Sequence, residues 1–349
     1  MVVAYGPCAL RRDEATNTAP RNVFPELRAK QRLQQSVKNE NNVSSVTPFR
    51  TLSNRDGGIV FPASLCYSDS GDLYISDNNG QKIQYWPADS ATARPLSTVD
   101  AKIELKFPNT VQWSSGRILV SDNEGIKTFS PEGHLERLTR SYFGVSSFAV
   151  TDKGTILANT LIRNPHNDDP LIVETDPSGK QIRGFGNRRN VADHNGAEDI
   201  AFLAVSKTLL FAAFKNHPTV EIYDLDFGKL IASRTIDHPV FRDLQKELTS
   251  DNASEGQQQG RVFVPRYLAG IRVVADRVFL CLHLPEPEIL ELDREGKPLA
   301  AFRISGLPPA VDIFGFDVRL DKGNLLFAVG TIDQQWNATV SESKVKMSL

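Results

Sequence analysis

The sequence has 349 residues, with 40 Lys+Arg and 42 Asp+Glu, and so a formal net charge of −2. A nucleic-acid-binding protein needs a basic excess to displace phosphate counterions, so this balance excludes a nucleic-acid partner. Hydrophobic residues make up 40% of the chain and charged residues 23%, as in an ordinary soluble globular protein. No apolar run reaches about 18 residues, so no transmembrane segment is predicted.

The first part of the chain, residues 1–42, precedes every repeat described below and is predicted to be a leader. Helix formers follow Pro25 in residues 25–38, which favours a short surface helix, and a flexible leader is the alternative. Residues 1–17 lack a basic residue before their apolar piece, which argues against a signal peptide. The compartment is left open: periplasmic or secreted if the true start lies upstream, and cytoplasmic otherwise.

The three cysteines, Cys8, Cys66 and Cys281, are widely spaced and odd in number, unlike a disulfide framework or a zinc ribbon. Cys66 and Cys281 stand in apolar, strand-like runs, where small buried thiols are expected. A bridge between these two cysteines is the alternative.

A pattern of strand, turn, strand, turn and strand occupies residues 61–86. Its turns read Asp-Ser-Gly and Asn-Asn-Gly, residue types that supply the positive φ of tight hairpins. Residues 107–129 repeat the pattern, and SDNEG there echoes SDNNG in the first copy. Looser copies are centred on Phe148, Ile200, Ile271 and Phe316.

A second turn signal recurs after the third strand of four copies, at residues 130–133, 176–179, 224–228 and 293–296. It predicts a fourth strand in each unit, and four-stranded units repeated in this way are typical of propeller blades. The longest spacing between copies, from Ile200 to Ile271, contains the polar stretch 243–260. We expect that stretch to be an exposed inserted loop.

Six units fit the chain, and the last lacks an obvious fourth strand, which residues 46–52 would supply from before the first unit. Such a closure protects sheet edges that would otherwise be exposed. The sequence therefore predicts an all-β protein, a six-bladed β-propeller of four-stranded antiparallel blades whose ring is closed by an N-terminal strand. The predicted propeller spans residues 43–341, and residues 342–349 form a C-terminal tail.

The element Phe61-Pro62, followed by GDLYISD at residues 71–77 and then Ile83, resembles the NHL repeat. The resemblance is clearest in the first unit, good in the second and looser afterwards. It extends to the NHL-like group of six-bladed propellers and the related TolB-like propellers over residues 43–341. It implies the propeller fold and leaves the function open, because this group includes binding scaffolds, lyases and lactonases.

Propellers of this group use the face on which the innermost strands begin, which we name the channel-mouth face. Residues just before each first strand are expected there, together with the polar connection 183–199, whose arginines could clamp a carboxylate or phosphate. A self-paired surface loop is the alternative for that connection. The aromatic residues Phe314 and Trp336 could line an apolar pocket or pack between blades. The predicted ligand-binding residues are Ser64, Asn109, Thr110, Ser147, Arg188, Arg189, His194, Glu198 and Asp199.

The resemblance also brings in metal-dependent enzymes. Calcium-dependent lactonases of the gluconolactonase and regucalcin type hold their ion with carboxylates and amides from several blades, whereas Glu198 and Asp199 stand in one unit and Asn109 is the single amide. The amidating lyase of the NHL-like group holds zinc through histidines, and no His follows the Phe-Pro elements here. Histidines on the mouth loops could still converge on zinc as neutral imidazoles. If a metal is bound, the candidates are His166, His194, His217 and His283.

The sequence thus predicts a non-catalytic binding scaffold that takes a protein, peptide or small-molecule ligand at the channel-mouth face. A metal-dependent lactonase or lyase is the alternative. No cofactor is predicted for the scaffold, whereas the enzyme would need calcium or zinc. No catalytic residue is identified, since no Gly-x-Ser-x-Gly, His-Glu-x-x-His or phosphate-binding loop occurs. The ligand and the oligomeric state are left open.

Overall fold

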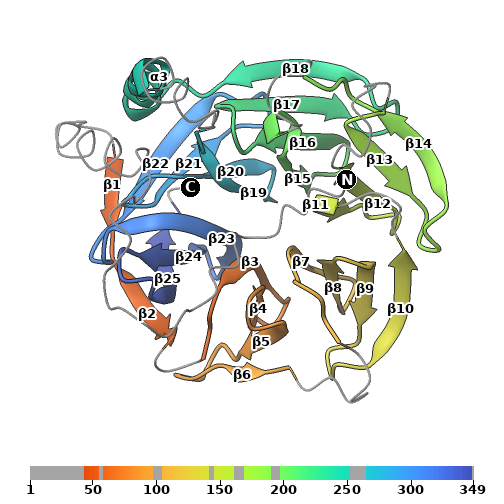
Figure 1. Ribbon diagram of the computed structural model, residues 1–349, viewed down its shortest axis with the longest axis horizontal. Coiled ribbons are helices and arrows are strands. Elements are labelled where there is room, and N and C mark those ends of the chain that lie inside the picture. Colours follow the sequence, from red (N-terminus) through yellow and green to blue (C-terminus); the bar gives the residue numbers. More distant parts are fainter. Residues whose placement is uncertain are drawn as a thin grey trace.

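A computed structural model describes residues 43–54, 58–96, 104–140, 145–160, 169–189, 197–251 and 265–347. Six sheets are arranged in a ring, with the first strand of each nearest the centre (Figure 1). The predicted all-β six-bladed propeller is thereby confirmed. The predicted leader and its helix at residues 25–38 lie outside the described residues.

Blades one to three each contain four antiparallel strands that follow one another in sequence. Blade one contains β3 (Pro62–Tyr67), β4 (Leu73–Asp77), β5 (Lys82–Trp86) and β6 (Arg94–Pro95). Blade two contains β7 (Val111–Ser114), β8 (Arg117–Asp122), β9 (Gly125–Phe129) and β10 (Leu135–Arg140). Blade three contains β11 (Val145–Val150), β12 (Ile156–Thr160), β13 (Ile172–Thr175) and β14 (Gln181–Phe185).

Blades four and five repeat this arrangement, whereas only three strands of blade six follow one another in sequence. Blade four contains β15 (Ala201–Val205), β16 (Leu209–Phe214), β17 (Thr219–Asp224) and β18 (Leu230–Thr235), preceded by the short helix η1 (Ala197–Asp199). Blade five contains β19 (Leu268–Val274), β20 (Arg277–Leu282), β21 (Glu288–Leu292) and β22 (Pro298–Ile304). Blade six contains β23 (Ala310–Asp321), β24 (Asn324–Asp333) and β25 (Ala338–Lys346) from the end of the chain.

Two N-terminal strands complete the last two blades. Strand β2 (Pro48–Ser53) pairs antiparallel with β25 and is the outer strand of blade six, as the sequence predicted. Strand β1 (Val43–Val46) pairs in parallel with β22 and gives blade five a fifth strand. Both strands cover edges that would otherwise be open. Strand β25 continues to Lys346, past the predicted end of the propeller at 341, because its last residues still pair with β24.

Three of the four turns predicted after the third strands share one geometry, and in the fourth the N–H of Gly228 donates to the carbonyl of Asp224, four residues earlier. The backbone N–H of Gly133, Gly179 and Gly296 donates to the carbonyl three residues earlier, each over 3.0 Å. All three glycines have a positive φ between 80° and 92°. Glycine takes this conformation without the steric cost that a side chain would add, so these turns are placed where the sequence expects them.

The core of the ring lies between neighbouring blades. Among the described residues the buried apolar side chains form six clusters, and each cluster draws on two adjacent blades. Between blades five and six, for example, Phe279 meets Phe327 edge to face, with 6.0 Å between ring centroids. Each blade is therefore held by both neighbours, and the position of every first strand is fixed from two sides.

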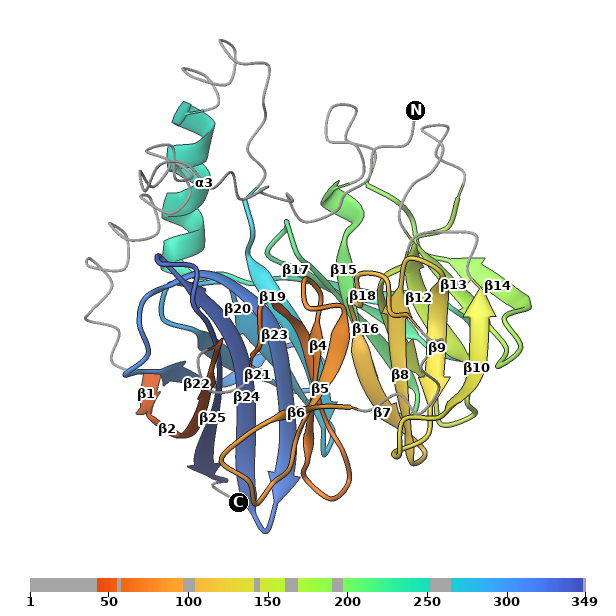
Figure 2. The same cartoon turned by 60° about the horizontal axis from the view of Figure 1, so that its bottom comes forward.

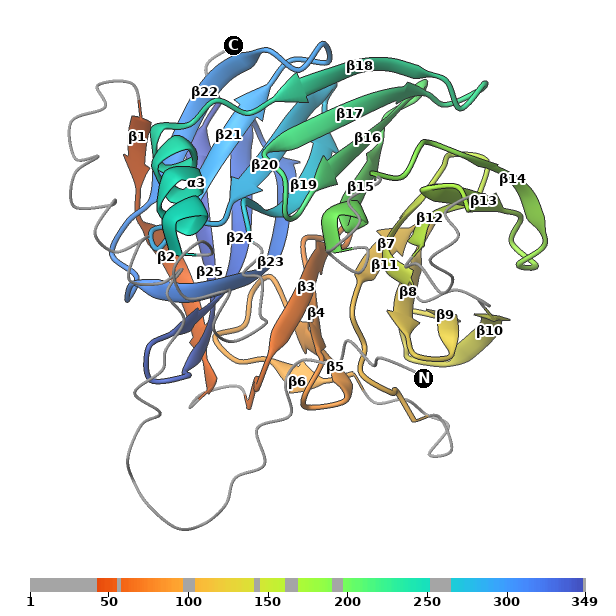
Figure 3. The same ribbon diagram turned by 45° about the horizontal axis from the view of Figure 1, so that its top comes forward.

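The connection between blades four and five differs from the prediction. Residues 243–260 were expected to be an exposed loop, but helix α3 (Pro239–Asp251) occupies the first part of this stretch and projects from the ring (Figures 2 and 3). Val240, Phe241 and Leu244 are buried in the cluster between blades four and five. The spacing of these three residues places them on one helical face, with Pro239 in the first turn. No helix in the described ranges is long and apolar enough to cross a membrane.

Candidate functional site

Several predicted ligand-binding residues make hydrogen bonds from one blade to the next. Asn109 donates through Nδ2 to the carbonyl of Ser146 in blade three over 3.1 Å, and its own carbonyl accepts from Ser76 Oγ in blade one over 2.7 Å. Thr110 Oγ1 also donates to the Ser146 carbonyl, over 3.4 Å. Ser64, in β3, is half-buried, and its carbonyl accepts from Ser76 Oγ over 3.3 Å. These contacts join blades one, two and three at the channel mouth.

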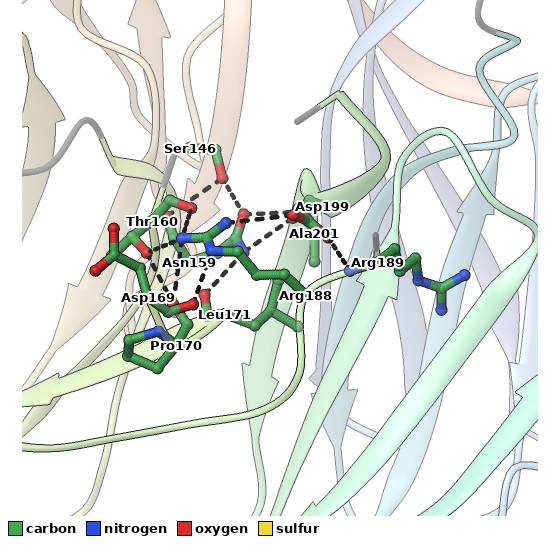
Figure 4. Close-up of polar contacts among 10 residues, drawn as sticks. All are labelled: Ser146, Asn159, Thr160, Asp169, Pro170, Leu171, Arg188, Arg189, Asp199 and Ala201. Atoms are coloured by element: carbon green, nitrogen blue, oxygen red, sulfur yellow. Dashed lines mark hydrogen bonds and ion pairs between the residues drawn. The ribbon is translucent and has the colours of Figure 1, made fainter. Parts of the chain in front are cut away.

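The same arrangement continues between blades three and four. Ser147 Oγ accepts from the backbone N–H of Leu203 over 3.2 Å. Asn159 Nδ2 donates to the carbonyls of Leu171 and Asp199 over 3.2 and 3.0 Å, and its Oδ1 accepts from the N–H of Ala201 over 3.0 Å (Figure 4). The buried Asn159 side chain is therefore satisfied by both blades. Sequence reasoning missed it, although its place at the end of a second strand is the signal that could have found it.

Arg188 and Asp199 form a buried pair at this junction (Figure 4). Arg188 Nη1 lies 3.4 Å from Asp199 Oδ2, and Arg188 Nη2 donates to Thr160 Oγ1 over 2.8 Å. Further bonds from Arg188 reach the carbonyls of Asp169, Thr160 and Pro170. Asp199 Oδ1 accepts from the backbone N–H of Arg189 over 2.8 Å. The N–H groups of Arg188 thus donate to acceptors of the protein itself, as a buried guanidinium requires.

Arg189 and His217, near the same junction, are more exposed than the Arg188–Asp199 pair. The Arg189 guanidinium is 3.3 Å from Glu221 Oε1 and lies over the Phe214 ring, 3.8 Å from its centroid. His217 Nε2 lies 3.2 Å from Glu198 Oε2. Burial and the positive charge of Arg189 lower the pKa of His217, although Glu198 opposes them. The imidazole is therefore mostly neutral near pH 7 and can offer a hydrogen bond rather than a charge.

A second charged group, at the entrances to blades five and six, was not predicted. Asp312 binds the Arg266 guanidinium through Oδ2, and its Oδ1 lies 2.5 Å from His283 Nε2. Burial acts to raise the pKa of Asp312, but the charge of Arg266 and the hydrogen bond with His283 hold it well below its usual range. Asp312 Oδ1 also accepts from the N–H of Ile313 over 3.0 Å. The carboxylate is thus ionised and fixes both partners in place.

The prediction missed Arg266 and Asp312 because it started the last two first strands too late. It placed the mouth just before Ile271 and Phe316, but β19 and β23 begin at Leu268 and Ala310 and contain register shifts near their starts. Gly315, expected at the mouth, lies inside β23, where an added Cβ would stand 2.6 Å from Cγ of Leu65. This glycine permits the close approach of blades six and one.

The four metal candidates are not brought together among the residues that the structure describes. His217 and His283 each approach a carboxylate of their own, Glu198 and Asp312. His166 and His194 lie outside the described residues. Within the described ranges no group of three or more His, Cys, Asp or Glu side chains is placed to hold a metal ion. The predicted sites for calcium or zinc therefore stay predictions.

The opposite end of the channel contains a cavity of about 450 Å³. It is lined by the last residues of the innermost strands of all six blades, among them Cys66, Trp113, Arg272 and Asp317. Arg272 Nε donates to Asp317 Oδ1 over 2.6 Å, and Arg272 Nη2 donates to the carbonyl of Leu65 over 3.1 Å. Asp317 Oδ2 accepts from the N–H of Tyr67 over 2.6 Å. This pair joins blades five, six and one, as Asn159 and Arg188 join blades three and four.

Comparison with known proteins supports the fold but assigns no activity. No family model and no curated protein sequence matches the chain. A gluconolactonase from Xanthomonas campestris is similar in structure, with a TM-score of 0.53, 12% identity, and coverage of 84% of this chain and 89% of that one. The calcium-binding protein regucalcin from Agrobacterium tumefaciens has a TM-score of 0.56, 10% identity, and coverage of 88% and 98%. A streptogramin B lyase has a TM-score of 0.50, 14% identity, and coverage of 86% and 89%.

At these identities the likenesses establish a six-bladed propeller and do not assign an activity. The NHL assignment stays a prediction.

Proposed function

We propose that the protein is a non-catalytic binding scaffold whose channel-mouth face, at blades four to six, binds an acidic ligand. One observation carries this proposal: in three pairs the basic side chain is more exposed than the carboxylate that holds it. The side-chain exposures are 21% for Arg189 against 14% for Glu221, 40% for His217 against 10% for Glu198, and 36% for Arg266 against 17% for Asp312.

This arrangement suits the capture of carboxylates. Arg189 and Arg266 are already held by Glu221 and Asp312, so little side-chain freedom is lost when a ligand binds. Each lies near an aromatic ring, Phe214 and Phe314 respectively, which restrains the guanidinium further. A planar guanidinium with a fixed orientation can donate two parallel hydrogen bonds to one carboxylate. His217 adds a hydrogen-bonding imidazole between them in the order of the blades.

Titration calorimetry with a short Glu/Ser peptide, and with a Lys/Ser peptide of equal length, tests the proposal. We expect the acidic peptide to bind, with an affinity that falls as salt is added, and the basic peptide not to bind. Arg189→Gln should weaken binding about three- to fivefold, the range for a partly exposed ion pair. Arg117→Gln is the matched control, because Arg117 is also exposed and paired with a carboxylate, Glu136, but lies at the start of β8 on the opposite face. Equal effects of the two substitutions would reject this location.

The metal-dependent lactonase or lyase is separated from the scaffold by elemental analysis. The protein is loaded with calcium and zinc, dialysed extensively and compared with a His217→Ala, His283→Ala double variant. The scaffold predicts no stoichiometric metal in either sample. Near-stoichiometric zinc that is lost in the variant, or stoichiometric calcium, would overturn the scaffold proposal and direct assays to lactone substrates.

A further inference from the structure

One turn on the channel-mouth face, between β24 and β25, places tryptophan where two turns of the same geometry on the opposite face place glycine. Asp333 Oδ1 accepts from the N–H groups of Gln335 and Asn337 over 2.9 and 2.8 Å, and the N–H of Trp336 donates to the Asp333 carbonyl over 3.0 Å. The same three bonds occur in the turns that begin at Asp176 and Asp293. In those turns the residue equivalent to Trp336 is Gly179 or Gly296.

This position requires the left-handed backbone conformation. Trp336 has a φ of +61°, where Gly179 and Gly296 have +92° and +80°. A bulky side chain is disfavoured there, since its Cβ crowds the backbone and its ring cannot make the local hydrogen bonds that help Asn or Asp. Trp336 is nevertheless 53% exposed, so burial does not offset the strain. Strain that folding does not require is commonly found where a protein binds something.

The turn is continuous with the proposed binding surface. Its flanking residues Ile332 and Ala338 belong to the cluster between blades six and one, against which Phe61 and Phe314 pack. The rings of Phe61 and Phe314 are 4.0 Å apart, and Arg266 lies 5.9 Å from the centroid of Phe314. One sector of the mouth face thus runs from the basic Arg266 through two aromatic rings to the cluster beneath Trp336.

We propose that Trp336 is an apolar anchor for an acidic protein segment, in which an apolar side chain stands near the carboxylates that Arg266 and Arg189 bind. This inference rests on the proposed function and specifies its partner. The partner is acidic because Arg266, which reaches this sector through Phe314, is more exposed than its own carboxylate Asp312, and Arg189 at the next blades of the mouth face is likewise more exposed than Glu221. It is partly apolar because a half-exposed tryptophan on a rigid turn loses little freedom and much water-exposed area on contact.

Three short synthetic peptides of equal length test this pairing by titration calorimetry: one of Glu and Leu, one of Glu and Ser, and one of Lys and Leu. We expect the Glu/Leu peptide to bind at least about tenfold more tightly than the Glu/Ser peptide, and the Lys/Leu peptide not to bind. Trp336→Gly and Trp336→Asn should remove this tenfold advantage and leave the affinity for the Glu/Ser peptide unchanged. Phe227→Ala is the matched control, because Phe227 is an exposed aromatic residue in the turn between β17 and β18, on the opposite face.

Stability gives an independent readout. Trp336→Gly should raise the Tm by about 1–3 °C, because it restores the residue that the turn favours. Weaker binding together with a higher Tm cannot come from damage to the fold. Equal binding of the Glu/Leu and Glu/Ser peptides, or a lowered Tm in Trp336→Gly, would overturn the anchor role while leaving the acidic-ligand proposal standing. Failure of both acidic peptides to bind would instead overturn the proposed function.

Discussion

Arg188 and Arg189 are neighbours in the connection that leaves blade three. Substituting Arg188 should lower mainly stability, and substituting Arg189 should lower mainly ligand affinity. Arg188→Met would leave Asp199, whose side chain is 2% exposed, without its cationic partner and would release the carbonyls of Asp169, Thr160 and Pro170. Breaking a buried pair by removing one partner costs about 3–5 kcal/mol. Arg189→Met removes a partly exposed pair and a contact with Phe214, which together contribute about 1 kcal/mol.

The Tm of each variant, measured by thermal unfolding, tests these two free-energy costs. The unfolding entropy of a ring of this length is about 0.6 kcal/mol/K, so 3–5 kcal/mol corresponds to a Tm lower by about 5–8 °C for Arg188→Met. For Arg189→Met the Tm should fall by no more than about 2 °C. Affinity for the Glu/Ser peptide, measured well below both Tm values, should fall for Arg189→Met and stay near the wild-type value for Arg188→Met.

Equal Tm shifts in the two variants would refute the reasoning, because they would mean that the buried network around Asp199 adds no more to stability than a surface pair. A double variant, Arg188→Met with Asp199→Leu, sharpens the test. If the cost of Arg188→Met comes from the stranded carboxylate, removing that carboxylate should restore part of the lost stability.

Three further predictions concern other parts of the ring. Leu244→Ala should lower the free energy of unfolding in urea by about 2–4 kcal/mol, since Leu244 lies on the buried face of α3, in the cluster between blades four and five; a change below about 1 kcal/mol would show that the helix is not docked. Because Arg266 and His283 lower the pKa of Asp312 despite its burial, its stabilising contribution is present at neutral pH and is lost as pH falls through the folded-state pKa. The wild type should thus lose more stability than Asp312→Asn between about pH 5 and pH 2, and parallel losses would contradict this. Cys66 and Cys281 are free and buried, and burial raises the pKa of their thiols. Ellman's reagent should therefore react with both only after the protein is unfolded, and no reducing agent should be needed first because neither thiol is in a disulfide. A fast reaction of either thiol in the native protein would contradict their burial.

The fold could be predicted because its information is local and repeated. The turns after the third strands need glycine for reasons of backbone geometry, and Gly133, Gly179 and Gly296 stand where those turns require them. Helix α3 was missed because the polar composition of residues 243–260 outweighed a pattern of only three apolar residues, two of which precede that stretch. The energy that holds the helix comes from docking between blades four and five, which no local signal reports.

The candidate site was predicted less completely, because the direction of a polar side chain at a blade entrance depends on the neighbouring blade. Asn109, Ser147 and Asp199 were expected to face a ligand, and their polar atoms bond to adjacent blades or to the connection between them. Arg266 and Asp312 were overlooked because irregularities at the starts of β19 and β23 shift the mouth away from the repeat register. Arg266 and Asp312 are far apart in sequence, so no motif spacing predicts that they pair.

The contacts at the mouth divide into two layers with different consequences. Buried polar groups, such as Asn159 and Arg188, fix where each innermost strand begins, because their partners lie on two blades at once. Arg189, Arg266 and Trp336 are more exposed, and each has a local support: Asp199 accepts from the N–H of Arg189, Asp312 binds Arg266, and Asp333 accepts from the N–H groups on both sides of Trp336. A binding group on a rigid element needs no reorganisation when its ligand arrives. Substitutions in the lower layer should therefore change Tm before they change affinity, and substitutions in the upper layer should change affinity first. If one Arg188 or Asn159 variant weakened peptide binding without lowering Tm, the division into two layers would be wrong at that residue.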